Sequence, residues 1–449
     1  VKRQLQAGKI NYLFVVDLFN EGVDIPEIDT VLFLRPTESA TVFLQQFGRG
    51  LRLHKDKDHL TVLDFVGHSR AEFSYKERFE SLIGRHSRDI LTEVKEGFQN
   101  APFGCKIILE EKAKEEIIAN IEGYLRSLNK NRIIKEIVAY HEACRDTFSL
   151  SGFLAYSHVP LHKVYGSLTW GELCQLAGVQ KEVSPHASLI KFAVSKKWIA
   201  TDSYSYFGSL LKFVDNEFNI VESSLSEMEK KNAIMFYYDM FEKAGQYESI
   251  QAMFDDLHND TLFISEIKEV LTIFQERCNA PEKDDNSVYS DWNPLRLHGV
   301  YTKAQIEAAL GISSFEREST SSRDGVERVR EIKLEAMYVD IIKKREEGSL
   351  TNYKDYARNR EFFQWETQHK VSADCPTAQQ YRNRENHQLL FVRQQSTHPE
   401  FKHTLGYTYL GEVVMQEMEG SKPIKILWHL NTPMSEATYA FASQYKAIG

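Results

Sequence analysis

Three short apolar runs, separated by helical stretches, constrain the fold of the first hundred residues more than any other feature of the chain. They lie at residues 13–17 (LFVVD), 30–34 (TVLFL) and 60–65 (LTVLDF). Short runs dominated by apolar residues are typical of parallel strands covered on both faces. The sequence therefore predicts a partial α/β domain, built on a parallel sheet, over residues 1–95.

The loops after these runs carry residues suited to sensing a nucleotide. The loop DLFNEGVDIP contains Gly22, which lets the backbone turn close to a ligand, and Asp24, which can accept a hydrogen bond from a ribose hydroxyl. Further on, residues 43–52 read FLQQFGRGLR, with Arg49 and Arg52 three positions apart. On one helical turn, both guanidinium groups would point at the same anion, such as a transferring γ-phosphate.

In this order, the two segments resemble motifs V and VI of superfamily-2 helicases. The resemblance implies the second RecA-like lobe of such an enzyme, truncated at its N-terminus. FNEGVDIP with QQFGRGLR is most similar to the DNA translocases of restriction enzymes and nucleotide-excision repair. Arg52 would be the arginine finger. The resemblance assigns nucleotide binding to Gly22, Asp24 and Gln45, and catalysis to Arg49 and Arg52.

Two motifs that ATP hydrolysis requires are missing from the sequence. No GxxxxGK[ST] phosphate loop occurs, and no DEAD- or DEAH-type box follows a predicted strand. A second lobe supplies arginines but does not cradle phosphate and magnesium by itself. We therefore expect this chain alone to bind neither ATP nor Mg²⁺ and to be inactive. The full-length protein is expected to use both through its missing first lobe.

Helical periodicity predicts a helical coupling region over residues 96–285. Residues 112–128 place isoleucine and leucine at helical spacing, and Thr169 with Glu172 predicts a capping box at a helix start. Residues 149–179 leave two interpretations open. One is a helix-turn-helix that binds DNA, and the other is a small helical bundle that packs between domains.

One acidic segment carries the charge imbalance of the chain. The formal net charge is −9, and residues 221–291 hold 6 Lys and Arg against 16 Asp and Glu, so the rest is near neutral. We expect Asp255, Asp256, Asp260 and Glu266 to be solvated, and the segment to suit a protein interface more than DNA. Residues 280–291 predict a polar linker.

From residue 293 onward the pattern changes to strands and aromatic residues. The sequence predicts a mostly antiparallel sheet or barrel over 293–449, with a half-buried strand at 332–339 that alternates as IKLEAMYV. Further predicted elements are strands at 389–392, 408–410 and 424–430, and a short helix at 301–310.

Residues 350–372 gather aromatic rings beside carboxylate and amide groups. Flat rings next to such groups are the parts needed to stack a base and read its edge, and nearby basic residues supply phosphate contacts. An aromatic core is the alternative interpretation of the same residues. The candidate DNA-binding residues are Tyr353, Asp355, Tyr356, Trp365, Lys343, Lys344 and Arg345.

This region, with YTYLGEVV at 407–414 and KPIKILWHL at 422–430, resembles the uncharacterised C-terminal domain that follows helicases in bacterial restriction proteins. Some of those proteins are type IV enzymes, whose C-terminal domain is thought to recognise modified cytosine. The resemblance implies double-stranded DNA, with or without modified cytosine, and an upstream nuclease domain as partners. A stand-alone DNA reader with a non-catalytic helicase remnant, and a fragment of an RNA helicase, stay open as alternatives.

Five scattered cysteines form no CxxC pair, which predicts reduced thiols, no metal site and a cytoplasmic protein. No apolar run reaches the roughly 18 residues of a membrane span, so we expect no membrane partner. A homodimer stays open.

Overall fold

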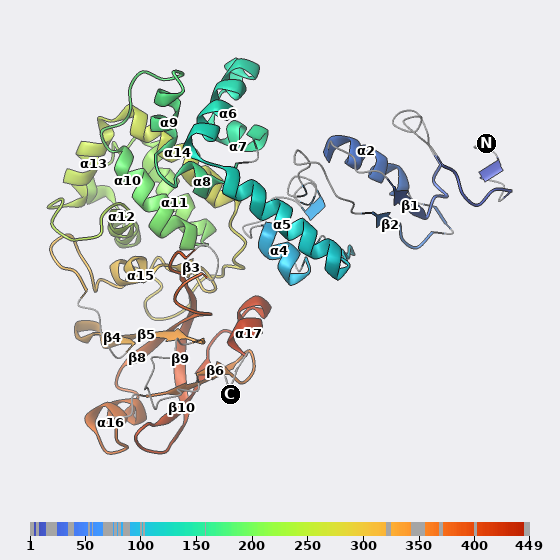
Figure 1. Cartoon of the computed structure of the whole chain (residues 1–449). Coiled ribbons are helices and arrows are strands. Elements are labelled where there is room, and N and C mark those ends of the chain that lie inside the picture. The colour runs from blue at the N-terminus through green and yellow to red at the C-terminus, as the bar shows by residue number, and fades with distance from the viewer. Residues whose placement is uncertain are drawn as a thin grey trace. The chain divides into compact units, whose positions relative to one another are not determined.

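The computed structural model divides the chain into two compact units, residues 1–132 and 133–449, which are described separately (Figure 1). It describes residues 4–5, 9–14, 25–34, 40–52, 54–55, 57–65, 75, 79, 82–83, 90–98, 101, 104–157, 159–319, 325–342, 355–367, 371–398 and 402–443.

The first unit contains a parallel strand pair joined through a helix. Strand β1 (Thr30–Phe33) and strand β2 (Thr61–Asp64) run parallel, and helix α2 (Ala40–Gly50) lies between them in the chain. Both strands were predicted, and the parallel α/β pattern is confirmed for them. Leu32 and Leu63 face each other in register and are about half exposed, so the expected cover on both faces is incomplete there. Of the strand expected at 13–17, residues 13 and 14 are not in a strand, and the others lie outside the described residues.

Two further helices of this unit pack against each other. Helix α5 (Glu111–Ser127) matches the predicted helix at 112–128, and its buried side includes Ile117 and Ile121. Helix α4 (Ile90–Glu96) lies against it, and an ion pair of 3.4 Å joins Lys95 on α4 to Glu122 on α5.

The second unit begins with a helical layer, drawn in green and yellow in Figure 1. Its helices are α6 (Lys130–Ala143), α7 (Leu150–Ser157), α8 (Leu161–Val164), α9 (Trp170–Leu176), α10 (Ala187–Phe192), α11 (Tyr204–Asp215), α12 (Glu227–Met240), α13 (Ile250–His258) and α14 (Thr261–Glu276). The predicted capping box of Thr169 and Glu172 is present at the start of α9. None of the helices that the structure describes has the length and apolar character of a membrane span.

The expectation that Asp260 and Glu266 are solvated is wrong. Glu266 is 8% exposed and accepts hydrogen bonds from the Tyr165 hydroxyl and from the backbone N–H groups of Trp170 and Gly171. Those two N–H groups lie in the first turn of α9, where the helix offers them no partner of its own. Asp260 is also buried and caps α14 by accepting from the Phe263 N–H. Both carboxylates are therefore internal acceptors for helix ends.

The C-terminal part of the second unit is an eight-stranded sheet. Its strands are β3 (Val300–Tyr301), β4 (Val326–Val329), β5 (Leu334–Asp340), β6 (Tyr356–Ala357), β7 (Phe362–Glu366), β8 (His387–Arg393), β9 (Tyr407–Glu419) and β10 (Lys425–Leu430). The helices beside it are α15 (Lys303–Ala309), α16 (Pro376–Asn383) and α17 (Glu436–Ala442).

The strand order is β4-β5-β8-β9-β10-β7-β6, and β3 pairs with β9. Among the described strands of this sheet, only β5 and β8 pair in parallel, so the sheet is mostly antiparallel. The order of these strands is an open path from β4 to β6 and not a closed barrel. Strand β5, predicted to be half-buried, is buried along most of both faces.

The helical layer and the sheet are joined by a buried polar network. Asp239 on α12 is fully buried and accepts hydrogen bonds from the Trp198 indole N–H (2.6 Å), the Tyr206 hydroxyl (2.7 Å) and the Gln305 amide on α15 (2.8 Å). Helix α15, which precedes most of the sheet in the chain, thus packs on the helical layer (Figure 1). The stretch expected to be a linker is also packed, because Tyr289 is 6% exposed. The sheet is not a separate body beyond a free linker.

Candidate nucleotide-sensing site and candidate DNA-binding segment

Helix α2 is held to strand β1 by an aromatic face. The ring of Phe43 is buried and lies 5.0 Å from the ring of Phe33, and the ring of Phe47, one turn further on, stacks on Phe43. Gly50 continues this face, where a Cβ would come within 2.7 Å of the Leu60 side chain. Gln45, which was predicted to bind nucleotide, lies on the exposed side of the helix. The packing therefore directs the polar side of α2 away from the sheet.

Arg52 lies two residues beyond the end of α2, so the expectation that Arg49 and Arg52 share one helical turn is wrong. The Leu51 N–H bonds to the Gly48 carbonyl at 3.2 Å, the tighter closure that often ends a helix. Glycines at 48 and 50 explain the early end, because each disfavours helix by about 1 kcal/mol. Arg52 is exposed, and the side chain of Arg49 lies outside the described residues.

The loop predicted to sense the nucleotide is described only in its last part. Gly22 and Asp24 lie outside the described residues, whereas the following Ile25 is 2% exposed. Lys57, which sequence reasoning missed, holds this last part. Its ammonium group donates to the carbonyl oxygens of Pro26 (2.9 Å), Ile28 (3.2 Å) and Gly50 (2.8 Å). No sequence signal distinguishes Lys57 from Lys55, because its three acceptors are backbone carbonyls, which every residue type carries.

In the candidate DNA-binding segment, Trp365 is a core residue. It is 8% exposed, and its ring lies at 90° to the ring of Tyr381 and near the ring of Trp428. All three belong to the hydrophobic core of the sheet and α16. For Trp365 the structure therefore supports the aromatic-core interpretation.

Tyr356 and Trp365 lie on opposite faces of the sheet. Tyr356 on β6 is the register partner of Gln364 on β7, and successive residues of a strand point to opposite faces. The structure therefore does not bring Tyr356 and Trp365 together around one base. Asp355 is 4% exposed and accepts the backbone N–H of Glu366 at 2.9 Å, so part of its acceptor capacity is used inside the fold. Tyr353, Lys343, Lys344 and Arg345 lie outside the described residues.

One of the amide groups of the predicted base-reading segment, that of Gln364, lies on the same face as Tyr356. Gln364 is 6% exposed, and its side-chain oxygen accepts from the Arg358 guanidinium at 2.8 Å. On neighbouring β10, the ring of His429 lies 5.0 Å from the ring of Phe362. This face, opposite Trp365, is the one on which polar groups and rings occur together.

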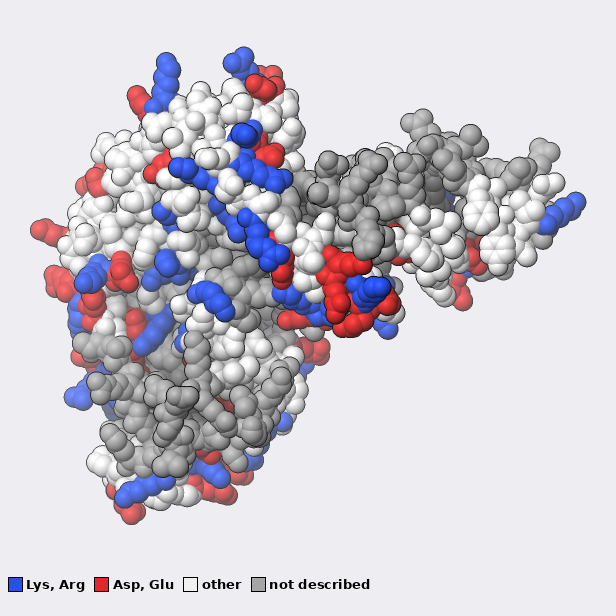
Figure 2. Space-filling view, in the orientation of Figure 1, with Lys and Arg blue, Asp and Glu red and all other residues white. Residues whose placement is uncertain are grey.

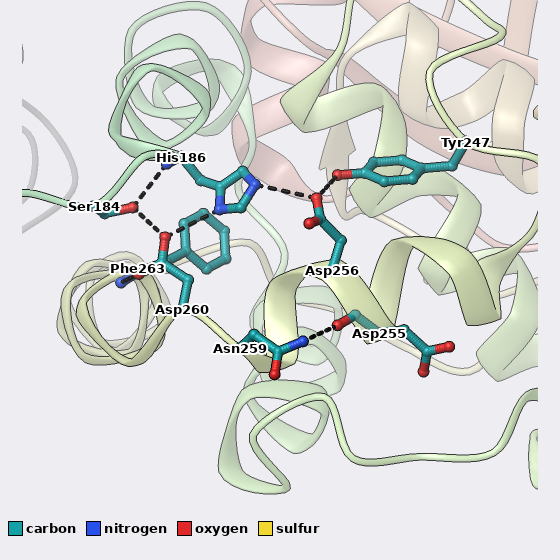
Figure 3. Close-up of polar contacts among 8 residues, drawn as sticks. All are labelled: Ser184, His186, Tyr247, Asp255, Asp256, Asn259, Asp260 and Phe263. Atoms are coloured by element: carbon teal, nitrogen blue, oxygen red, sulfur yellow. Dashed lines mark hydrogen bonds and ion pairs between the residues drawn. The ribbon is translucent and has the colours of Figure 1, made fainter.

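A second polar cluster surrounds His186, at the start of α10 (Figure 3). The two ring nitrogens of His186 lie 3.0 Å from an Asp260 carboxylate oxygen and 3.1 Å from an Asp256 one. Ser184 donates its hydroxyl proton to Asp260, and its oxygen accepts the backbone N–H of His186. The Tyr247 hydroxyl donates to Asp256.

This cluster resembles a catalytic triad only in its residue types. In a nucleophilic triad the serine hydroxyl bonds to the histidine ring, whereas here both ring nitrogens face carboxylates. Burial raises the pKa of Asp260, but hydrogen bonds from Ser184, the Phe263 N–H and His186 outweigh it and hold the pKa below its usual value. The cluster is a structural clamp between α10, α13 and α14.

Charges on the visible face of the second unit are mixed. Figure 2 shows a short run of Lys and Arg side chains across its helical part, with Asp and Glu side chains around it. Within the described residues, no group of three His, Cys, Asp or Glu side chains is arranged to hold a metal ion.

Comparison with known proteins identifies both ends of the chain. Residues 1–54 match the helicase conserved C-terminal domain, and residues 295–442 match a domain of unknown function (DUF3427). A candidate ATP-dependent helicase of Saccharomyces cerevisiae, IRC3, is 43% identical over 67 residues, which are 15% of this chain and 10% of the yeast protein. A 51.5 kDa protein of a Lactococcus phage (isolate 7-9) is 38% identical over 55 residues, 12% of each chain. No solved structure matches.

The chain thus spans about a tenth of the length of these relatives. The first match covers β1 and α2, and the second covers all eight strands of the sheet with α15, α16 and α17. The chain therefore carries a helicase C-terminal lobe at its start and a DUF3427 domain at its end.

Proposed function

We propose that this chain is the C-terminal portion of an ATP-dependent DNA helicase or translocase of a restriction or defence system. The observation that carries the proposal is the placement of Arg52, which is exposed directly after a helix anchored to a parallel strand. An arginine in such a place can reach an ATP held by another lobe and neutralise charge that develops on the γ-phosphate. Gln45 on the exposed side of the same helix would contact the nucleotide.

In this mechanism the residues of this chain contact a nucleotide that the missing first lobe holds. That first lobe supplies the phosphate loop and the Mg²⁺ ligands. Arg49 would act beside Arg52, and Gly22 with Asp24 would contact the ribose. The Phe33–Phe43 contact holds the helix that precedes Arg52 against strand β1. A lobe of this kind changes ATP turnover without holding the phosphates itself.

We further propose that the C-terminal domain binds double-stranded DNA and reads modified cytosine. The basic run on the helical part lies outside this domain and would add phosphate contacts to the same DNA. The face of β6, β7 and β10 that carries Tyr356, Gln364 and Arg358 supports contact with bases better than the face of Trp365. Asp355, which is 4% exposed and accepts the Glu366 N–H, remains a candidate in this proposal.

The test compares ATP turnover of the natural full-length protein without nucleic acid, with duplex DNA and with RNA. Stimulation by DNA supports the proposal, and stimulation by RNA alone would favour the RNA helicase. If turnover stays at background with both while the chain still binds DNA, the stand-alone reader replaces the enzyme. Binding of residues 1–449 to duplexes with and without modified cytosine, at two salt concentrations, tests the reader itself.

A further inference from the structure

We propose that Lys57 is a positioning residue that locks the nucleotide-sensing loop to the end of the arginine helix. The inference rests on the proposed function, because it assigns Lys57 a role in ATP turnover through Arg52. It concerns a residue outside both helicase-like segments, FNEGVDIP and QQFGRGLR.

The geometry of the Lys57 ammonium group is unusual for a surface lysine. It donates to three backbone carbonyls, which belong to Pro26, Ile28 and Gly50 at 2.8 to 3.2 Å. An ammonium group has three N–H donors, so these three acceptors use its full capacity. Some other lysines pair with carboxylates, as Lys230 does with Glu227 and Lys303 with Glu327. Lys114 and Lys191 each donate to one backbone carbonyl. Lys57 therefore fixes backbone positions, whereas Lys230 and Lys303 balance side-chain charge.

The three carbonyls come from the two segments that must act together. Pro26 follows Asp24 by two residues, and Gly50 precedes Arg52 by two residues. Pro26 and Ile28 precede Lys57 by 31 and 29 positions, and Gly50 precedes it by 7. Since both segments end in the same ammonium group, a displacement of the sensing loop moves the backbone beside Arg52. Lys57 thus ties the backbone that follows the predicted sensing loop to the backbone that precedes Arg52.

The local structure makes this link necessary. Helix α2 ends at Gly50, and the glycines that end it leave the backbone before Arg52 without a regular hydrogen-bond ladder. The Gly50 carbonyl is one of the last carbonyls of α2, and Lys57 is the partner that takes it. A cation at a helix C-terminus is also favoured by the helix dipole.

The test replaces Lys57 with methionine in the full-length protein and measures kcat and KM for ATP. Methionine keeps an unbranched side chain of nearly the same length and removes the three donors. We expect kcat to fall by about 10- to 100-fold, with a smaller change in KM, because misplacement of a group by about 1 Å costs up to this much in the transition state. Lys55→Met is the matched control, since Lys55 is exposed two residues away, and should leave kcat unchanged.

A double variant distinguishes positioning from general damage. If Lys57 acts through Arg52, then Arg52→Ala with Lys57→Met should be no slower than Arg52→Ala alone, within about threefold. Hydrogen exchange of residues 1–449 supplies a readout without ATP. In Lys57→Met, the amides of Ile28 and Leu51 should exchange faster, while those of α14 stay unchanged.

Two results would overturn the inference. One is unchanged kcat in Lys57→Met when Arg52→Ala is inactive, which leaves the proposed function intact. The other is a multiplicative loss in the double variant, which would make Lys57 a stability residue. If Arg52→Ala itself keeps full turnover, the proposed function fails first, and the inference fails with it.

Discussion

The segment around α2 and the segment around β7 both mix aromatic and polar residues, but they bury different parts of that mixture. Helix α2 buries Phe43 and leaves Gln45 exposed. Strand β7 buries its aromatic and its polar side chains alike. Trp365 lies in the core, and Gln364 on the opposite face is 6% exposed. A helix packed on a sheet keeps one side in solvent, whereas β7, which lies between β10 and β6, is buried on both faces. Polar residues in the helix can therefore reach a ligand, and most of those in the strand serve the fold.

The largest expected effect is on ATP turnover, and it tests the helix side of this comparison. Arg52→Ala in the full-length protein should lower kcat by a factor of order 10³, because it removes the charge that faces the γ-phosphate. DNA binding should stay nearly intact. Steady-state ATP hydrolysis and a DNA-binding isotherm measure the two effects. Unchanged hydrolysis would show that the exposed side of α2 is not the site.

The strand side is tested by Trp365→Ala. Removal of a buried tryptophan usually costs 3–5 kcal/mol in the free energy of unfolding, and we expect about 3 because one edge of the ring reaches the surface. Tyr356→Ala, on the other face, should cost about 1 kcal/mol and weaken DNA binding more. Urea unfolding followed by tryptophan fluorescence reports on this unit, since all five tryptophans lie within residues 133–449. An equal loss of stability in the two variants would show that the Trp365 face and the Tyr356 face of the sheet do not differ in their contribution to the fold.

The sequence predicted those features that depend on local pattern. The strands at 30–34 and 60–65, the helix at 112–128 and the capping box of Thr169 are set by residues close in the chain. The end of α2 before Arg52 was missed because the helix pattern was continued through two glycines. Glu266 and Lys57 were missed because their partners lie 95 to 101 and 7 to 31 positions away. Burial of Trp365 depends on β10 and α16, which residues 350–372 do not contain.

The buried Asp239 carboxyl should make the stability of the second unit depend on pH. Burial raises the pKa of Asp239 from its usual value near 3.8 to about 6, although Tyr206, Trp198 and Gln305 donate to it. A carboxyl whose pKa is raised in the folded state adds stability below its unfolded pKa, and that contribution is lost as pH rises through 6. At about 1.4 kcal/mol per pKa unit, the loss is roughly 2–3 kcal/mol.

We therefore expect the stability of the second unit to fall between pH 4 and pH 6.5, and Asp239→Asn to flatten that fall. Urea unfolding at the two pH values measures the slope, and the comparison between variants cancels other carboxyls such as Glu307, whose pKa burial also raises. Because the network joins α12 to α15, both the helical layer and the sheet should unfold together in each case. An equal slope in the variant would mean that Asp239 does not titrate in this window.

The smallest expected effect concerns the start of α9, where a cap foreseen in the sequence and one missed by it act on the same turn. Thr169 accepts the Glu172 N–H at 3.2 Å, and Glu266 accepts the N–H groups of Trp170 and Gly171. Thr169→Val keeps the shape of the side chain and removes its acceptor, which should cost about 1 kcal/mol. The cost stays small because Glu266 still satisfies the two neighbouring donors. Thr169→Ser, which keeps the acceptor, is the matched control, and unfolding monitored by fluorescence gives both values. A loss well above that of a single cap in Thr169→Val would show that Glu266 depends on Thr169 and that the two caps form one unit.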